Sequence, residues 1–368
     1  MDMDAKKTLI IGLSGNFLSD QRMQRIASAV AETSWEPIVY YRDYYKYKNG
    51  KALKTQSFSH QTHALRPVFK SGVLFYLWFN LLLFFKLLFK KTEAYYAVDS
   101  DTLLAFTLLS KLHAKPLVYD AHEYFAEVPE LNGKSLKKKL WHWLTQWGVK
   151  QAKVCITVGA ELALELERVY GKPFACVRNV TDAKTQEAVQ AFEKKTIIYQ
   201  GALNEGRELE LLINVMKELP EYHCLLVGEG DLSATLRQRA EGFGNIEFLG
   251  LLSPDELKKI TPKCFAGYNL LDASGSLSYY YSLSNKYFDY IHAALPSISS
   301  ELPEYLSLNA QWKCGVCLPN SKEALVNLIN FWKNNPSEYA KLKENTKFAA
   351  KENNWSLEKE TLKNLLKF

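Results

Sequence analysis

Short apolar runs of strand length alternate with helical patterns along the whole chain, and this alternation limits the possible folds more than any other feature. Such an order is typical of parallel βαβ units. In the first half, the expected strands are Thr8–Leu13, Glu36–Tyr41, Tyr95–Val98, Pro116–Tyr119, Val154–Val158 and Phe174–Val177. In the second half, they are Thr196–Gln200, Tyr222–Val227, Ile246–Leu249 and Ala266–Leu270. We therefore predict two doubly wound α/β sheets.

The chain has 368 residues, which is too long for one ordinary hydrophobic core and suits two domains of roughly 150–200 residues. A polar stretch from Asn179 to Lys195 separates the two series of strands. We place the N-terminal domain at residues 1–183 and the C-terminal domain at residues 184–355. Ligands of such sheets bind beyond the carboxyl ends of the strands, so functional residues are expected there.

The charge distribution favours an anionic surface over nucleic acid as a partner. A net charge of +6, from 46 basic and 40 acidic residues, is small, and no compact basic stripe with interleaved aromatic residues occurs. Lysines gather beside very apolar sequence in the first half, at positions 86, 90, 91, 134, 137, 138 and 139. The N-terminus lacks the apolar segment and cleavage site of a signal peptide, so we expect a cytoplasmic protein.

The segment Val73–Phe89 is the most apolar part of the chain. A membrane-spanning helix needs about 20 apolar residues, and Asn80 and Lys86 interrupt this one. Two other interpretations compete more strongly, namely an internal core helix and a helix with its aromatic face in the bilayer interface. The flanking lysines, which include Lys70, favour the interface, and with it peripheral contact at the inner face of the membrane.

Two short motifs have spacings that occur in metal sites. Cys314 and Cys317 could form half of a zinc site, but no second pair or histidine partner follows, so structural thiols are favoured. Asp99 and Asp101 could hold Mg²⁺ or Mn²⁺, or they could cap a helix that begins at Thr102. We favour the cap and expect no metal.

Two glycine turns follow strands in the second half. Gly201 ends one strand, and Arg207 is expected in the first turn of the next helix. A cation there opposes the helix dipole, which is understandable if a diphosphate binds at the strand ends. A solvated arginine is the alternative. The second turn contains Gly228 and Gly230, a pattern that is weak by itself.

A loop of small residues leads into a further helix, with Ser284 as its expected N-cap. Free backbone N–H groups at that end, together with Lys286, would form an anion site. Asp289 lies one turn later and could accept hydrogen bonds from ribose hydroxyls. The alternative is a capped helix with an ion pair between Lys286 and Asp289.

In the first half, the run from Tyr119 to Pro129 follows a strand directly. His122 could donate a hydrogen bond to a hydroxyl or to developing charge, and it titrates near neutral pH. A structural histidine is the alternative. Asp120 and Glu123 are candidates for orienting it.

Together these segments resemble glycosyltransferase family 4, the retaining transferases of GT-B fold, over nearly the whole chain. The resemblance is carried by Tyr119–Pro129, Gln200–Glu210, Leu225–Asp231, Ile246–Glu256 and Ser284–Pro296. It implies two facing Rossmann-like domains, with a UDP- or GDP-sugar in the C-terminal domain and a glycan or lipid-linked acceptor at the N-terminal one. It also implies that the final helix, residues 356–368, crosses back to the N-terminal domain.

The resemblance also implies roles for particular residues. Arg207 and Lys286 would neutralise the diphosphate without a metal, and His122 would contact the donor sugar. The implied donor-side residues are Gly201, Gly228, Gly230, Leu251, Ser282, Leu283, Ser284, Asn285 and Asp289. The implied acceptor-side residues are Gly15, Asn16, Asp20, Arg22, Asp99 and Glu123.

The sequence departs from the family pattern at the E-x7-E motif. Tyr280–Ser282 stands where the first glutamate is expected, and Asp289 replaces the second. This argues against a carboxylate nucleophile and for front-face displacement with the leaving phosphate as base. We therefore expect a retaining transferase of surface polysaccharide synthesis. A nucleotide-sugar epimerase of the same fold and an inactive, nucleotide-binding scaffold protein are the alternatives.

Overall fold

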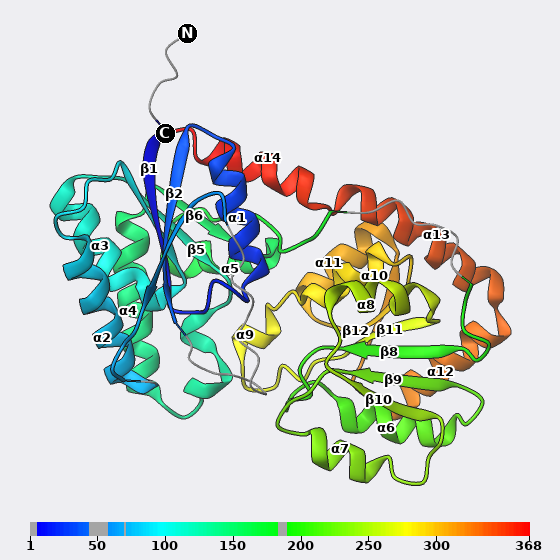
Figure 1. The fold of residues 1–368 in the computed structure, drawn as a ribbon. Coiled ribbons are helices and arrows are strands. Elements are labelled where there is room, and N and C mark those ends of the chain that lie inside the picture. The colour runs from blue at the N-terminus through cyan, green and yellow to red at the C-terminus, as the bar shows by residue number, and fades with distance from the viewer. Residues whose placement is uncertain (1–5, 44–57, 70, 183–189) are drawn as a thin grey trace. The chain divides into compact units, whose positions relative to one another are not determined.

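The computed structural model describes residues 6–43, 58–69, 71–182 and 190–368, and its chain divides into two units (Figure 1). Unit 1 comprises Met1–Asn179 and Glu358–Phe368, and unit 2 comprises Val180–Leu357. The domain boundary predicted between residues 183 and 184 lies outside the described residues.

Unit 1 is built on a seven-stranded parallel sheet with the order β3-β2-β1-β4-β5-β6-β7. Its strands are β1 (Lys7–Leu13), β2 (Trp35–Arg42), β3 (Gln61–Leu65), β4 (Ala94–Val98), β5 (Leu117–Ala121), β6 (Val154–Thr157) and β7 (Ala175–Cys176). The sheet confirms the predicted fold class. Strand β3 was not predicted, because its residues Gln-Thr-His-Ala-Leu lack the apolar run of a central strand; it lies at the edge of the sheet.

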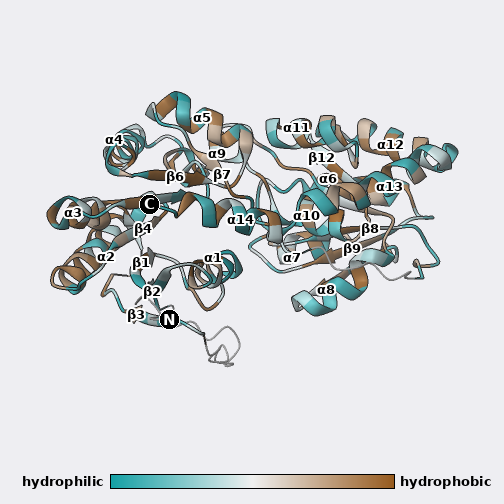
Figure 2. Ribbon diagram, turned by 90° about the horizontal axis from the view of Figure 1, so that it is seen from above, coloured by the Kyte–Doolittle hydropathy of each residue, from teal (hydrophilic) through white to brown (hydrophobic). Residues whose placement is uncertain are grey.

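The helices of unit 1 lie on both faces of this sheet. They are α1 (Gln21–Ala31), α2 (Gly72–Leu87), α3 (Leu103–His113), α4 (Ser135–Gln151) and α5 (Ala160–Tyr170). Helices α2, α3 and α4 lie side by side on one face, and α1 lies on the other (Figures 1 and 2). Asp20 is the N-cap of α1, because its carboxylate accepts a hydrogen bond from the backbone N–H of Met23 at 2.9 Å.

Helix α2 corresponds to the predicted apolar segment, and it is buried along one side only. Its buried residues are Phe75, Phe79, Asn80, Leu83 and Leu87. Asn80, which interrupts the apolar run, donates to the carbonyl oxygen of Asp101 at 2.6 Å and accepts from the N–H of Ala105 at 3.0 Å. It therefore ties α2 to the start of α3. None of the helices that the structure describes is long and apolar enough to cross a membrane. Lys70 lies outside the described residues.

Unit 2 contains a six-stranded parallel sheet with the order β10-β9-β8-β11-β12-β13. Its strands are β8 (Thr196–Gln200), β9 (His223–Val227), β10 (Ile246–Gly250), β11 (Ala266–Asn269), β12 (Ser297–Ser300) and β13 (Gly315–Leu318). Its helices are α6 (Leu209–Glu218), α7 (Ser233–Arg239), α8 (Pro254–Ile260), α9 (Leu277–Tyr280), α10 (Asn285–His292), α11 (Pro303–Trp312), α12 (Lys322–Asn334) and α13 (Pro336–Glu352). Strand β12, with the sequence Ser-Ile-Ser-Ser, was not predicted. It is fully buried, but its small polar residues lack the apolar run that is typical of a buried strand.

The last helix, α14 (Trp355–Leu365), leads the chain back to unit 1. The indole N–H of Trp35 donates to the carbonyl oxygen of Leu366 at 2.9 Å, and its ring packs against Phe368. Glu32 forms ion pairs with Lys359 and Lys363 at 3.1 and 2.8 Å. Residues 358–368 are therefore part of the packing of unit 1.

The packing of α14 can be tested at Leu362, which is fully buried. Leu362→Ala should lower the free energy of unfolding by about 2–5 kcal/mol, because it removes apolar contacts and leaves a cavity. Leu357→Ala is the matched control on the same helix, since Leu357 is 49% exposed. Urea unfolding followed by tryptophan fluorescence measures both. Equal losses for the two variants would mean that α14 does not pack as described.

Candidate functional site

A glycine follows or ends each of the strands β8, β9 and β10, and the backbones at these three strand ends are hydrogen-bonded to one another. The N–H of Gly201 donates to the carbonyl of Val227 at 2.9 Å, and the N–H of Gly228 donates to the carbonyl of Gly250 at 2.8 Å. A Cβ atom added to Gly228 would lie 1.8 Å from the carbonyl oxygen of Gly201. Gly228 also has a φ of +140°, which side chains rarely allow. Only glycine therefore lets these two turns approach each other.

Gly230 is packed just as closely against the turn that follows β8. A Cβ atom there would lie 2.2 Å from the side-chain oxygen of Asn204. That oxygen accepts a hydrogen bond from the N–H of Asp231 at 3.0 Å. The predicted glycines 201, 228 and 230 are thus brought together at one edge of the sheet of unit 2.

Two cations lie at this edge. Lys286, in the first turn of α10, places its Nζ atom 5.0 Å from the ring centre of Tyr199. The guanidinium carbon of Arg207 lies 5.2 Å from the ring centre of Tyr279. Burial, together with the positive charge of Arg207, lowers the pKa of Lys286 to about 7, although Asp289 opposes this shift.

Neither cation has a carboxylate as an ion-pair partner within the described ranges of the chain. Asp289, one turn after Lys286, instead accepts a hydrogen bond from the side-chain amide of Gln200 at 3.0 Å. The alternative of an ion pair between Lys286 and Asp289 is therefore wrong. Two neighbouring cations without a carboxylate favour an anion with more than one charge.

The structure corrects the predicted setting of Arg207. Gly206 and Glu208 have left-handed backbone conformations, with φ of +76° and +52°, and α6 begins only at Leu209. Arg207 therefore lies in the turn before the helix, and the argument from the helix dipole does not apply to it.

The loop before α10 is held by hydrogen bonds that the sequence did not reveal. Ser284 occupies the N-cap position, but its hydroxyl donates to the side-chain oxygen of Asn269 at 2.7 Å and makes no capping hydrogen bond. The N–H of Ser284 donates to the hydroxyl of Tyr305 at 3.0 Å. The hydroxyl of Ser282 is buried and has no hydrogen-bond partner among the described residues. Leu283 is half-buried, whereas Asn285 and Leu251 are exposed.

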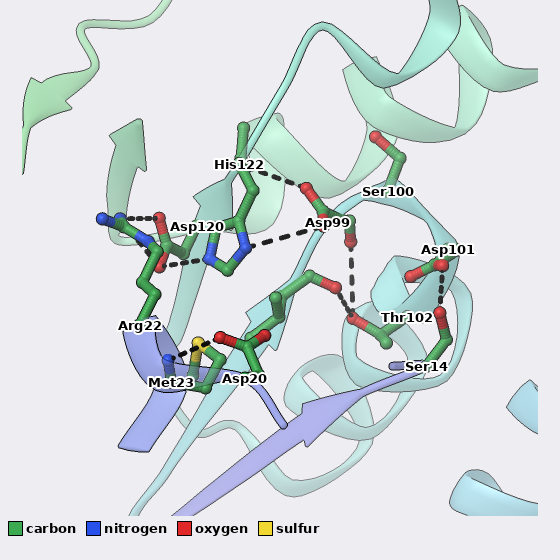
Figure 3. A network of polar contacts seen from close by, with 12 residues as sticks. Ser14, Asp20, Arg22, Met23, Asp99, Ser100, Asp101, Thr102, Asp120 and His122 are labelled. Carbon is green, nitrogen blue, oxygen red and sulfur yellow. Dashed lines mark hydrogen bonds and ion pairs between the residues drawn. The ribbon is translucent and has the colours of Figure 1, made fainter. Parts of the chain in front are cut away.

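In unit 1, His122 lies at the carboxyl end of β5, between two carboxylates (Figure 3). Its Nε2 atom is 3.1 Å from Oδ2 of Asp120, and its Nδ1 atom is 3.9 Å from Oδ2 of Asp99. Its backbone N–H donates to Oδ1 of Asp99 at 2.8 Å. Burial opposes protonation, but the charges of Asp120 and Asp99 raise the pKa of His122 above its usual value.

Asp120 is fully buried and orients His122 through a network (Figure 3). Arg22 donates to its carboxylate at 3.0 Å and to the carbonyl of Val177 at 2.8 Å. The hydroxyl of Tyr96 donates to the same carboxylate at 2.8 Å. Burial disfavours the charged form, but Arg22 and His122 hold the pKa of Asp120 below its usual range. Arg22, predicted on the acceptor side, makes these contacts from a buried position.

The carboxylates of Asp99 and Asp101 point to different partners (Figure 3). Asp99 has a left-handed φ of +56°, makes no side-chain cap and faces His122, so the predicted cap is wrong. Asp101 is buried and accepts a hydrogen bond from Ser14; burial, together with Asp99, raises its pKa to about 8.

The described residues contain no group of three or more His, Cys, Asp or Glu side chains that could hold a metal ion. Cys314 and Cys317 are free thiols in this part of the chain, and Cys314 is fully buried.

The remaining predicted residues of unit 1 surround the turn after β1. Asp20 caps α1, and the side-chain oxygen of Asn16 accepts from the N–H of Leu18 at 3.1 Å. The carbonyl of Gly15 accepts from the N–H of Arg42 at 3.2 Å. Glu123 is exposed. Sequence reasoning missed Tyr96, Tyr199 and Tyr279, because only the fold brings these rings to the site.

Comparison with known proteins bears on the family and on the fold. The family model described as "Glycosyl transferases group 1" matches residues 181–348. A sequence search of curated proteins gives no match.

Solved structures resemble the chain over almost its full length. HepE of Anabaena, in complex with UDP and glucose, matches with a TM-score of 0.76 at 14% identity, covering 98% of this chain and 99% of HepE. Sucrose-phosphate synthase of Thermosynechococcus elongatus matches with a TM-score of 0.76 at 14% identity, covering 98% of each chain. WaaG, a glycosyltransferase involved in lipopolysaccharide biosynthesis, matches with a TM-score of 0.69 at 13% identity, covering 98% of this chain and 100% of WaaG. The fold is therefore that of the GT-B glycosyltransferases.

The close contact between glycine turns yields a direct test. Gly228→Ala should lower the free energy of unfolding by about 2 kcal/mol or more. The new methyl group would clash with the carbonyl oxygen of Gly201, whose backbone is held by its hydrogen bond to Val227. Gly244→Ala is the control, since nothing lies within 4 Å of its Cβ position and its φ is not positive. It should stay within about 0.5 kcal/mol of the parent in thermal and urea unfolding. A Gly228→Ala variant as stable as the control would contradict the described contact.

Proposed function

Because the chain carries a domain of the glycosyl transferases group 1 family on a GT-B fold, we propose that it is a retaining glycosyltransferase that uses a nucleotide diphosphate sugar. The acceptor in this proposal is a glycan or a lipid-linked glycan of surface polysaccharide synthesis. The observation that carries the proposal is the pair of cations, Arg207 and Lys286, without a carboxylate partner in the described chain.

The donor side of the proposal rests on unit 2. A nucleotide diphosphate has two adjacent charged phosphates, which suit a pair of neighbouring cations better than a single charge does. The exposed backbone of Gly201 lies beside Lys286, so an anion can approach it there without meeting a side chain at that position. HepE was solved with UDP and glucose and with UDP-glucose, which favours UDP as the nucleotide.

In the proposed reaction, the bond between the anomeric carbon and the phosphate oxygen breaks, and the acceptor oxygen bonds to the same face of that carbon. The acceptor hydroxyl gives its proton to the departing phosphate oxygen. Arg207 and Lys286 stabilise the charge that develops on the leaving diphosphate. No protein nucleophile is required, which agrees with a tyrosine at position 281 and with Asp289 hydrogen-bonded to Gln200.

His122 is assigned to the transfer step. When His122 is protonated, its Nε2 atom is bound by Asp120, and its Nδ1 atom, 3.9 Å from Asp99, presents a polarised N–H donor suited to a sugar hydroxyl. The negative charges of Asp120 and Asp99 beside His122 would repel a diphosphate. We therefore do not propose that His122 binds the diphosphate.

The acceptor is assigned more broadly. WaaG, which shares the fold, is described as acting in lipopolysaccharide biosynthesis. Surface glycans and their lipid-linked precursors are therefore the acceptor class that we propose, and unit 1 is the unit that would bind them.

Nucleotide binding and sugar transfer can be separated by two substitutions. Lys286→Met should abolish most of the thermal stabilisation by UDP, because ligand stabilisation follows RT ln(1 + [L]/Kd). His122→Ala should keep that stabilisation but lower the transfer rate by roughly 100-fold, the usual effect of losing a positioned proton donor. Lys259→Met, at an exposed lysine on α8, is the control for both.

The measurements are thermal shifts with UDP, GDP and ADP, and release of nucleotide from UDP-sugars with a panel of glycan acceptors. The anomeric configuration of the product, determined by NMR, tests retention. Epimerisation of the donor without an acceptor would replace the proposal by an epimerase. Nucleotide binding without transfer to any acceptor would replace it by a scaffold protein.

A further inference from the structure

Exposed large apolar side chains are concentrated on three helices of unit 1. Fourteen of the twenty-four such side chains in the described chain fall between residues 68 and 143. Those on the helices are Val73, Leu74, Leu77, Trp78, Leu81 and Phe85 of α2, Leu108 and Leu112 of α3, and Leu136, Leu140 and Trp143 of α4. We call this set the α2–α4 face. Exposed apolar residues are common singly, but clusters of this kind mark binding surfaces.

The α2–α4 face is continuous, because the three helices pack directly against one another (Figure 2). Gly148 of α4 lies so close to α3 that an added Cβ atom would be 2.7 Å from Leu103. On the outer side, Lys111 of α3 lies 5.0 Å from the ring centre of Trp147, which stacks on Trp143 of α4. Helices α2 and α3 are joined by Asn80.

The charge on these helices has one sign. Helices α2, α3 and α4 contain six lysines and no aspartate or glutamate. Lys138 is paired with Glu127 at 2.7 Å. The other five, which have no ion-pair partner in the described part of the chain, are Lys86, Lys111, Lys137, Lys139 and Lys150. Apolar side chains among unpaired lysines complement a surface that is apolar inside and anionic outside.

We propose that the α2–α4 face binds the surface of an anionic lipid bilayer. Leucine, phenylalanine and tryptophan side chains enter the interface, while lysines bind lipid phosphates around them. Helix α2 lies along the bilayer rather than across it, because its inner side packs on unit 1 through Phe75, Phe79 and Leu83. The proposal combines two of the three interpretations of the apolar segment, because the helix would contribute to the core and to the interface at once.

The position of the α2–α4 face gives it a function. The ring of Tyr76 on α2 lies 5.1 Å from that of Trp141 on α4, and Asn80, one turn further along α2, donates to the carbonyl oxygen of Asp101 in the turn between β4 and α3. Asp99 and Asp101 lie in that same turn, and Asp99 contacts His122. Bilayer binding therefore brings the polar network of unit 1 close to the lipid surface. This last step rests on the proposed function, because it supplies a lipid-linked acceptor.

Flotation with vesicles tests the proposal. The full chain should float with vesicles of phosphatidylcholine and phosphatidylglycerol in equal amounts, and much less with phosphatidylcholine alone. The triple variant Phe85→Gln, Leu112→Gln and Leu140→Gln should weaken partitioning at least roughly tenfold, because it removes apolar contacts from three helices. The double variant Lys139→Gln and Lys150→Gln should also weaken it roughly tenfold or more.

The controls lie on unit 2. The triple variant Leu306→Gln, Phe331→Gln and Phe348→Gln removes apolar side chains that are 46–54% exposed and should leave partitioning unchanged. The double variant Lys258→Gln and Lys259→Gln matches the loss of charge. Thermal stabilisation by UDP, measured without vesicles, should be the same for every variant, so a failure of lipid binding is distinguishable from a failure of the nucleotide assignment.

Three outcomes would overturn the proposal. The first is no flotation with anionic vesicles. The second is equal partitioning of the parent and of the variants on the α2–α4 face. The third is a dimer in light scattering that the face variants disrupt while flotation is absent, which would make the face a contact between two copies of the chain.

Discussion

The interaction on which the account depends is the repulsion between Arg207 and Lys286. The two positive charges are held at one sheet edge, partly buried, with tyrosine rings beside them and no carboxylate partner in the described chain. Such an arrangement costs folding free energy unless an anion binds. The surrounding features agree with this explanation: Gly201, which is exposed, lies beside Lys286, and the carboxylate of Asp289 accepts a hydrogen bond from Gln200.

Unit 1 has the opposite electrostatic arrangement, with positive and negative groups paired. The charged groups around His122 are paired, since Arg22 binds Asp120 and His122 lies between Asp120 and Asp99. The result is one oriented imidazole rather than an anion site. Unpaired positive charge occurs instead on the outside, on helices without acidic residues. This difference agrees with the tasks that we propose for the two units: a diphosphate site in unit 2, and a hydrogen-bond donor and a lipid-binding surface in unit 1.

Much of the fold follows from local pattern, and the failures have physical causes. Central parallel strands are apolar runs, so β1, β4 and β8 could be predicted, whereas the edge strand β3 and the serine-rich β12 could not. The glycines and Lys286 could be found because a turn between a strand and a helix has a sequence pattern. Tyr199, Tyr96 and Gln200 could not, because their contacts join segments far apart in sequence. Local reasoning was also wrong about Arg207 and about the hydroxyl of Ser284, whose settings depend on left-handed residues and on Asn269.

Proton uptake on UDP binding tests the central claim most directly. Lys286 has a pKa lowered to about 7, and a neighbouring diphosphate would raise that pKa again. At a pH of about 8, binding should therefore take up most of one proton, seen in calorimetry as a binding enthalpy that depends on the ionisation enthalpy of the buffer. Lys286→Arg should bind UDP without this uptake, since arginine stays charged throughout. No uptake by the parent chain, or the same uptake by Lys286→Arg, would contradict the account.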